Sequence, residues 1–447
     1  MRESIRHLAV DILTQVNDGR SFASPLLDSC LDAYRLSATP DGKLLTYLVY
    51  GALRHRGYLD WITTKLYRGN FRNLDERIKN ILRISVFQLK FSDRLPSFAV
   101  VDEAVKITQI ISPGKSGLVN AVLRNFLRQD KNIPFPPLRK NTAEYISLFH
   151  SHPLWVVKEW LSALGEQNTV ALCTANNQIP PFTLRANTLK ISPDKLSKNL
   201  RPQGFITTTT VYSPDGLIIV QSDQTIQKTE AFYQGLLRLQ DEGSQCIPYL
   251  INPKKNESIL DVCAGTGGKA THLAAIINNQ GHIVAIDNDP EKISELKKEA
   301  TRMGITLIDS RMADVSANLP EEFHERFDHV LVDAPCSGTG TLRRNPEIKW
   351  RLAPSDINKS TVIQNKILCN ASHAVKRGGQ LIYCTCSLLS KENEHIINTF
   401  LAKNKHFLLC KPPSSINQSL IDSKHFYRTY PHIHNMDGFF AAVLRRD

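Results

Sequence analysis

The 447-residue sequence lacks a long apolar run and an export segment. A helix that spans a bilayer needs about 18–20 consecutive apolar residues, and no stretch of the chain approaches that length. The segment Met1–His7 opens on charges rather than on an apolar region with a cleavage site, which disfavours secretion. We therefore predict a cytoplasmic protein without a membrane partner, and separately we expect a monomer.

The nine cysteines lack the spacing of a disulfide framework. An odd number of scattered cysteines in a long chain favours reduced thiols. Cys384 and Cys386 could form half of a metal clip, but no second Cys-x-x-Cys pair or histidine cluster supplies the other ligands. We therefore predict no metal site.

The composition is that of a folded protein with an uneven charge. Hydrophobic residues make up 42% and charged residues 22% of the chain, and its length predicts two or three domains. Residues 1–140 hold 22 Lys and Arg against 13 Asp and Glu, so they carry +9 of the net charge of +12. A phosphate backbone would favour such a region, although a basic solvated helical surface explains it as well.

The chain divides at changes of hydrophobic pattern. Apolar residues recur at helical spacing up to about residue 130, and the proline-rich Ile133–Pro137 marks a linker. Phe182–Thr188 alternates as a strand does, and from Leu239 strands alternate with helices, the pattern of a doubly wound parallel sheet. We predict an all-α region over 1–140, a small α+β region over 141–235 and an α/β Rossmann-like region over 236–447.

In the third region, the expected strands are Ser258–Val262, His282–Asp287, Thr306–Asp309, His329–Asp333 and Gln380–Thr385. The helices between them are expected to begin near Gly268, Pro290 and Asp356. Lys405–Leu409 and Gly438–Leu444 have the pattern of an antiparallel addition.

A glycine-rich turn follows the first of these strands. Gly265, Gly267 and Gly268 let the backbone approach a ligand without a clashing Cβ. Asp287 ends the next strand, 20 residues after Gly267, where an acid can bind the ribose hydroxyls of a nucleoside. Asp314, after the third strand, is placed to accept the amino group of adenine, or else to cap a helix or loop.

NAD and S-adenosylmethionine would both suit a ribose-binding acid. The turn lacks the Gly-x-Gly-x-x-Gly order of NAD sites, and no His or Arg for hydride transfer follows a strand end. Cys336 and Cys386, fifty residues apart, each follow a buried strand and so lie at strand carboxyl ends. Strand-end thiols favour methyl transfer and S-adenosylmethionine.

A cysteine is required if the acceptor is C5 of cytosine. This carbon is too weak a nucleophile to take a methyl group unaided, and a thiolate that adds to C6 activates it. Two thiols then have two roles, attack and release of the product, and spacing does not decide which thiol has which. Cys384 competes with Cys386 for assignment because both lie on one strand face.

The segments Asp333–Gly340 and Thr385–Ser387 resemble the Asp-Ala-Pro-Cys-Ser-Gly and Thr-Cys-Ser motifs of the RNA (cytosine-5)-methyltransferases. The resemblance extends over essentially the whole chain, and the order of the N-terminal helices is similar to the NusB-like RNA-binding domain that one branch of this family carries. It implies that Cys386 attacks and that Cys336 assists release, whereas the DNA enzymes would assign attack to the Pro-Cys thiol.

The resemblance also implies a set of supporting residues. Asp333 would hydrogen-bond cytosine N3 or act as a base, and Lys269 would balance the nearby acids or merely be solvated at a helix start. The implied contacts to S-adenosylmethionine are Cys263, Ala264, Gly265, Thr266, Gly267, Gly268, Lys269, Asp287, Asp314 and Asp333. Thr266 stands where the family usually has proline, which puts the stiffness of the turn in doubt.

The expected partner is 16S ribosomal RNA, free or partly assembled. Arg185 lies in a segment that matches the family's Arg-x-Asn-Thr motif, and Arg343, Arg344 and Lys349 lie beside Trp350, a combination that suits single-stranded RNA. The segment Asn435–Phe440 matches the family's closing motif and is expected near the site. Two alternatives stay open: a transfer-RNA enzyme of the same chemistry, and an RNA-binding assembly factor without activity.

Overall fold

Helices follow one another along the chain from Ile5 to Asn176, and the periodicity of the sequence predicts them up to about residue 130. The computed structural model describes residues 4–19, 21–92 and 95–447, so Met1–Glu3 of the charged N-terminal segment lie outside the described residues. The helices are α1 (Ile5–Asn17), α2 (Ala23–Ala33), α3 (Pro40–Arg54), α4 (Arg56–Leu66), α5 (Glu76–Phe91), α6 (Ser97–Ile111), α7 (Ser116–Gln129), α8 (Thr142–Phe149) and α9 (Leu154–Asn176). α9 is kinked at Gly165, whose φ is 76°.

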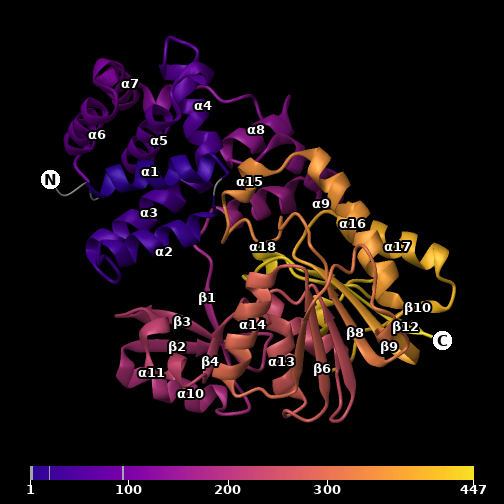
Figure 1. Cartoon of the computed structure of the whole chain (residues 1–447). Helices are drawn as coiled ribbons and strands as arrows, with labels where there is room; N and C mark the ends of the chain where they lie inside the picture. Colours follow the sequence, from indigo (N-terminus) through magenta and orange to yellow (C-terminus); the bar gives the residue numbers. More distant parts are fainter. Residues whose placement is uncertain (1–3, 20, 93–94) are drawn as a thin grey trace. The chain divides into compact units, whose positions relative to one another are not determined.

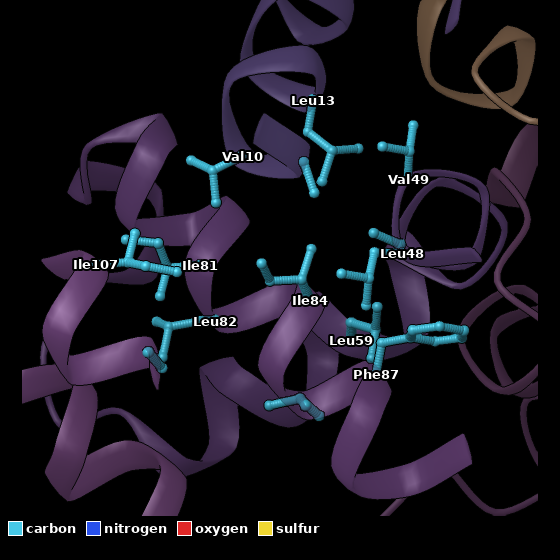
Figure 2. Packing of buried hydrophobic residues seen from close by; sticks show 14 of the residues in the cluster. Val10, Leu13, Leu48, Val49, Leu59, Ile81, Leu82, Ile84, Phe87 and Ile107 are labelled. Carbon is cyan, nitrogen blue, oxygen red and sulfur yellow. The ribbon is translucent and has the colours of Figure 1, made fainter. Parts of the chain in front are cut away.

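The core of the helical unit lies around α5. This helix is buried on nearly all sides from Ile78 to Gln88, as expected for a central helix. A Cβ on Gly51 would lie 2.1 Å from the ring of Phe87, so α3 can approach α5 only with glycine there. Figure 2 shows part of this packing, with labelled side chains Val10, Leu13, Leu48, Val49, Leu59, Ile81, Leu82, Ile84, Phe87 and Ile107.

The structure groups the chain into two units whose limits differ from the three predicted regions. One unit comprises Met1–Ile179 together with Leu342–Arg351, and the other comprises Pro180–Thr341 together with Leu352–Asp447. Leu342–Arg351 belongs to the predicted α/β region, but this segment, which includes α15 (Ile348–Arg351), packs within the helical unit.

The second unit contains a small antiparallel sheet. Its strand order is β2-β3-β1-β4. The strands are β1 (Phe182–Ala186), β2 (Phe205–Thr209), β3 (Gly216–Ser222) and β4 (Leu237–Leu239), with α10 (Pro193–Leu200) and α11 (Glu230–Tyr233) between them. Leu184, Leu217 and Phe205 pack on Leu196 and Leu200 of α10.

A larger sheet of the same unit has the order β10-β12-β9-β8-β5-β6-β7, with β11 paired to β12 (Figure 1). The strands are β5 (Ser258–Val262), β6 (His282–Asp287), β7 (Ile308–Met312), β8 (Phe327–Asp333), β9 (Val375–Thr385), β10 (Phe407–Cys410), β11 (Tyr427–Arg428) and β12 (Phe440–Arg446). β5 to β9 are parallel, and β12 is antiparallel to β9.

Helices cover both faces of this sheet, and each face has its own apolar cluster. One cluster includes residues of α12 (Glu242–Ile251), α13 (Gly268–Ile276) and α14 (Pro290–Met303). The other includes residues of α16 (Pro354–Ser372) and α17 (Glu394–Lys403). A short α18 (Pro431–His434) precedes β12.

The connections reverse direction between β5 and β8. The chain runs from β5 through β6 to β7 on one side of the sheet, then returns to β8 and β9 on the other side. In open α/β sheets, the carboxyl ends of the strands at such a switch point form the ligand site. The end of β5 leads into the glycine-rich turn and the end of β8 leads into Cys336, so both motifs lie at this point.

All the predicted strands of this sheet are present, but several bounds differ. β8 and β9 begin earlier than predicted, at Phe327 and Val375, and β10 and β12 lie one or two residues further along the chain. β7 begins at Ile308 rather than Thr306, and it is an edge strand that carries few buried residues, so its apolar signal is weak. Both closing strands were expected to be antiparallel to the rest of the sheet, but only β12 is. β10 is antiparallel to β12, so it runs in the same direction as the parallel strands β5 to β9. None of the described helices combines the length and apolar character needed to cross a bilayer.

Buried neutral histidines predict loss of stability in acid. Burial and the charge of Arg185 together lower the pKa of His272 to about 4, while the hydrogen bond to Asp215 acts in the opposite sense. Because the unfolded chain takes up a proton near pH 6.5 and the folded chain resists it until about pH 4, we expect His272 to cost about 1.4 kcal/mol of stability per pH unit between these two values. Thermal unfolding at pH 7.5 and 5.0 measures this loss.

The control compares His272→Gln with His282→Gln, since His282 is exposed. We expect the midpoint of His272→Gln to fall less between the two pH values than that of the natural chain. An equal fall in both variants would contradict the assignment. His152, also buried and with a lowered pKa, adds to the total loss in the natural chain.

Candidate active site

The two thiols predicted to react lie side by side at the ends of neighbouring strands. β8 ends at Asp333, three residues before Cys336, and β9 ends at Thr385 just before Cys386. The Sγ atoms are 3.4 Å apart, and both side chains are half-buried. β8 and β9 are adjacent and parallel, so the sheet itself brings the two motifs together.

Glycine permits a third segment to close on these turns. The Gly340 N–H donates to the carbonyl of Cys386 at 2.8 Å, and the Gly438 N–H donates to the carbonyl of Gly340 at 2.8 Å. A Cβ on Gly340 would lie 2.0 Å from the carbonyl oxygen of Gly438. The predicted closing motif therefore does lie against the thiol site.

Asp333 has a partner for each carboxylate oxygen. Lys269, at the start of α13, places Nζ 2.5 Å from Oδ2, and the thiol of Cys384 donates to Oδ1 at 3.4 Å. Burial would lower the pKa of Lys269, but the Asp333 carboxylate outweighs it and the pKa is raised. Lys269 is therefore a charged, buried partner of Asp333 rather than a solvated helix-start residue.

Cys384 differs from the other two thiols. It is fully buried, and burial together with the Asp333 charge raises its pKa well above the usual range. Its position beneath Asp333 suits support of that carboxylate and does not suit attack on a substrate.

Asp261, in β5, is an acid that the sequence reasoning missed. It is completely buried, and no side chain among the residues that the structure describes donates a hydrogen bond to its carboxyl oxygens. Burial raises the pKa of Asp261 to about 8, and the charge of Asp333 adds to the shift. The only sequence signal was its place at the end of an apolar strand, directly before the glycine-rich turn.

The glycine-rich turn has the backbone of a ligand loop. Cys263, Gly265 and Gly267 all have positive φ, at 61°, 56° and 81°. A Cβ on Gly265 would meet no atom within 4 Å, so this peptide borders open space, whereas one on Gly267 would lie 2.8 Å from Leu296. Gly265 therefore leaves room for a ligand, and Gly267 permits α13 to pack against α14.

Asp287 is joined to this turn. Its Oδ2 accepts the Gly265 N–H at 2.9 Å and its Oδ1 accepts the Asp289 N–H at 3.0 Å. The open peptide and the acid beside it fit a nucleoside with vicinal hydroxyls. Asp314 is exposed, and its Oδ1 accepts both the N–H and the hydroxyl of Ser316, at 2.9 and 2.7 Å, which lower its pKa.

Arg185 requires a correction. It was predicted to contact RNA, but its side chain is fully buried. Its guanidinium donates to the carbonyl of Gly268 at 2.6 Å and to Thr271 Oγ1 at 3.0 Å. Because its donors hold the first turn of α13, Arg185 supports the ligand turn from the antiparallel sheet.

A second arginine, which is half-buried, holds the same turn. Arg238 of β4 donates to the carbonyl oxygen of Thr266 at 3.1 Å and to its Oγ1 at 2.9 Å, while Glu299 of α14 accepts from it at 2.9 Å. Thr266 is the residue that replaces the family's proline. Its hydroxyl thus restrains the turn where a proline ring would otherwise do so.

Two of the three cations near Trp350 also require correction. Lys349 is 1% exposed, and its Nζ donates to the carbonyls of Arg54 and Ser151 and to Asn177 Oδ1. Arg343 is 5% exposed and donates to the carbonyl of Ile179. These two side chains hold the 342–351 segment within the helical unit, and their donors do not face solvent. Arg344 is half-buried, and its RNA contact stays a prediction.

The open α/β sheet has a turn suited to a nucleoside on one side of its switch point and reactive groups on the other side. This arrangement is that of a methyltransferase. Three family models match the chain: "16S rRNA methyltransferase RsmB/F" over residues 248–445, "NusB family" over 3–128 and a RsmF/B-like ferredoxin-like domain over 152–226. A curated protein of Bacillus subtilis, "Probable ribosomal RNA small subunit methyltransferase B", is 31% identical over 100% of this chain and 99% of its own length. The chain belongs to the ribosomal RNA small subunit methyltransferase B family.

Other relatives agree with this assignment. A protein of Synechocystis with the same name is 32% identical over 99% of each chain. Among solved structures, "Crystal Structure of PH0851" has a TM-score of 0.82 and 26% identity, and covers 100% of both chains. A methyltransferase homologue of Pyrococcus horikoshii has a TM-score of 0.59 and 27% identity, and covers 68% of this chain and 99% of its own.

These similarities confirm the predicted family and fold class, including the NusB-like helices and the small α+β region. They also support S-adenosylmethionine as the methyl donor. The geometry of the site agrees with this donor, since the glycine-rich turn and Asp287 beside it fit its nucleoside. The roles of the individual site residues stay predictions. The structure brings the expected residues of the active site together, whereas burial excludes Arg185, Arg343 and Lys349 from contact with RNA.

The Arg238 contact predicts a measurable effect on cofactor binding. Arg238→Gln removes a charged donor from both oxygens of Thr266, an interaction worth about 1.5–3 kcal/mol. We expect the affinity for S-adenosylmethionine to fall about tenfold because the turn is less restrained, as measured by calorimetric titration.

The exposed Arg201 of the same region supplies the control, and Arg201→Gln should bind as the natural chain does. Adding Thr266→Pro to Arg238→Gln should recover part of the affinity, since proline fixes φ. Undiminished affinity in Arg238→Gln would show that Thr266 needs no such partner.

Proposed function

We propose that this protein transfers a methyl group from S-adenosylmethionine to C5 of a cytosine in 16S ribosomal RNA, with Cys386 as the nucleophile. The observation that carries the proposal is the pair of half-buried thiols, 3.4 Å apart, at the carboxyl ends of the neighbouring strands β8 and β9. A reaction that first forms and then breaks a bond to the base has a use for two thiols.

Covalent attack makes the chemistry feasible. The Cys386 thiolate adds its electron pair to C6 of cytosine, which gives C5 the character of an enamine carbon. S-adenosylmethionine supplies the electrophilic methyl group that C5 takes up. A base then removes the C5 proton, the C5–C6 double bond re-forms, and the electron pair of the Sγ–C6 bond returns to Cys386.

The proton on the thiol pair favours this division of roles. The hydrogen bond to Cys386 and burial both raise the pKa of Cys336 well above that of a free thiol. The protonated form of Cys336 is therefore favoured, which makes this thiol poorly suited to attack as a thiolate. A protonated Cys336 beside the adduct is suited to assist the release of the methylated RNA.

Asp333 and Lys269 bracket the position of the base in this proposal. The carboxyl of Asp333 can hydrogen-bond cytosine N3 and its amino group, and so stabilise the charge that develops during addition. Lys269 holds that carboxylate from the side of α13. The loop Cys263–Lys269 and Asp287 would bind the nucleoside of the donor, and the exposed Asp314 its adenine.

The RNA target follows from the family and from charge. The relatives are named as ribosomal RNA small subunit enzymes, and the excess of positive charge lies in the NusB-like part of this chain. A stacked base must be flipped out or lie in a loop to be reached, so a separate RNA-binding unit is useful for positioning.

Bisulfite sequencing of total RNA from cells with and without this protein tests the function as a whole. We expect one or more protected cytosines in 16S ribosomal RNA to become convertible when the protein is absent. Loss of protection in transfer RNA instead would favour the transfer-RNA enzyme, and unchanged protection in all RNA would contradict methylation of cytosine C5.

Substitution of the two thiols separates attack from release. Cys386→Ala should abolish methylation and form no adduct with RNA that contains 5-fluorocytosine, whose C5 substituent blocks elimination. Cys336→Ala should still attack and transfer the methyl group, then accumulate as a covalent complex on ordinary cytosine. Denaturing electrophoresis detects the complex.

Cys410→Ala is the matched control, because this half-buried thiol lies on β10 away from the site, and it should behave as the natural chain does. The double variant of Cys336 and Cys386 should lose the trapped complex. A complex that accumulates with Cys386→Ala would reverse the two roles.

A further inference from the structure

Glu392 is a buried acid that the reaction above does not use. It ends a short 3₁₀ turn (Ser390–Glu392) just before α17, and none of its surface is exposed. An acid without exposure requires several hydrogen-bond donors to replace water. These donors come from the two cysteine turns.

The carboxylate contacts the residue that follows each thiol. Oε1 accepts the Ser337 N–H at 2.9 Å, and Oε2 accepts the hydroxyls of Ser337 and Ser387, both at 2.5 Å. Ser337 follows Cys336 and Ser387 follows Cys386. One side chain therefore joins the two turns whose thiols are 3.4 Å apart.

Gln364 of α16 completes the arrangement. Its Nε2 donates to Glu392 Oε1 at 3.1 Å and to the carbonyl of Pro335 at 2.9 Å. Four donors thus converge on two oxygens, which is about the number that an ionised carboxylate accepts. Gln364 and Glu392 hold both ends of the Pro335–Ser337 turn.

The next residue fixes the second turn from the same place. The Thr385 hydroxyl donates to Asn393 Oδ1 at 2.6 Å, and Asn393 Nδ2 donates to the carbonyl of Ser387 at 2.9 Å. The hydroxyl of Tyr383 donates to the carbonyl of Glu392 at 2.7 Å, so β9 holds the turn that carries this acid. The backbone around Glu392 is therefore fixed by the strand that carries Cys386.

We propose that Glu392 is a positioning residue that sets the spacing of Cys336 and Cys386, and that the two thiols can act on one base only while it bridges their turns. The part that concerns catalysis rests on the proposed function, whereas the spacing itself does not. Serine follows each cysteine because its hydroxyl and, at Ser337, its N–H reach this carboxylate.

The charge of Glu392 has a second consequence for Cys336. After the hydrogen bond to Cys386 and burial, the Cys386 and Glu392 charges are further causes that raise the pKa of Cys336, and the N–H of Gly338 opposes them. Glu392 thus favours the protonated thiol at Cys336, which is the form needed for release.

Glu392→Gln tests the proposal with little change of volume. An amide replaces one acceptor oxygen by an NH₂ group that confronts the donors of Ser337 and Ser387 or of Gln364. We expect kcat to fall at least tenfold while the KM for S-adenosylmethionine stays within twofold, since the donor loop does not contact Glu392.

The spacing is measured without RNA by oxidation with diamide. Two thiols in contact form a disulfide as each loses a proton and the azo group of diamide takes up two electrons and two protons. We expect the Cys336–Cys386 disulfide, quantified by peptide mass spectrometry, to form at least fivefold more slowly in Glu392→Gln, because loss of the contact between the thiols outweighs the larger fraction of thiolate at Cys336. Alkylation of Cys336 by iodoacetamide should also shift to lower pH.

Glu394→Gln is the matched control, since Glu394 lies two residues further on and pairs with Arg428 instead. It should leave both thiol rates unchanged. Ser387→Ala, which removes one hydroxyl only, should slow disulfide formation to a smaller extent, and it serves where Glu392→Gln does not fold.

The proposal would be overturned if Glu392→Gln formed the disulfide and reacted with iodoacetamide at the rates of the natural chain. If only Ser387→Ala folds, unchanged rates in that variant would overturn it. A natural chain that shows rapid disulfide formation but no methylation of any RNA would instead contradict the proposed function and leave the spacing role supported. The two failures are therefore distinguishable.

Discussion

The ion pair between the buried Lys269 and the half-buried Asp333 is the interaction on which the site depends. It joins the first turn of α13, where the ligand loop ends, to the end of β8, where the thiol turn begins. Loss of Asp333 would leave the charge of Lys269 buried without compensation, which typically costs about 3–5 kcal/mol. Burial and the charge of Asp333 raise the pKa of Asp261, which favours the neutral form of this second acid beside the ion pair.

The elements that could be predicted are those whose signal is local. β5 and β6 have the predicted bounds because each is a continuous apolar run between turn residues. The convergence of Asp333, Cys336 and Cys386 was also predictable, since parallel strands end at one edge of a sheet. Asp261 and Glu392 were not predicted, because nothing adjacent in the sequence indicates that distant donors or charges surround them.

Patterns of charge in the sequence predict contact with RNA wrongly where the cation is buried. Arg185, Arg343 and Lys349 have the residue types and neighbours of RNA contacts, but each is almost completely buried and donates to carbonyl oxygens of distant segments. A single sequence does not reveal that Leu342–Arg351 leaves the α/β unit and packs with helices. In these buried positions, arginine and lysine donate hydrogen bonds to carbonyl groups that lack another partner. Binding a phosphate requires the same kind of donor, so the residue types alone do not separate the two roles.

This embedded segment limits what a truncation can show about RNA binding. Burial, together with the charge of Arg54, lowers the pKa of Lys349 to about 7, so its Nζ depends on the three oxygens that accept from it. Removing residues 1–140 would delete the Arg54 carbonyl and also the Leu53 carbonyl that accepts from Trp350. A chain shortened in this way loses the packing of a segment that connects directly to the Cys336 turn, as well as its basic charge. Substitution of exposed cations in the full chain, such as Arg68, Arg72 and Arg128, changes the charge and leaves that packing in place. The salt dependence of RNA affinity in those variants therefore reports electrostatics alone.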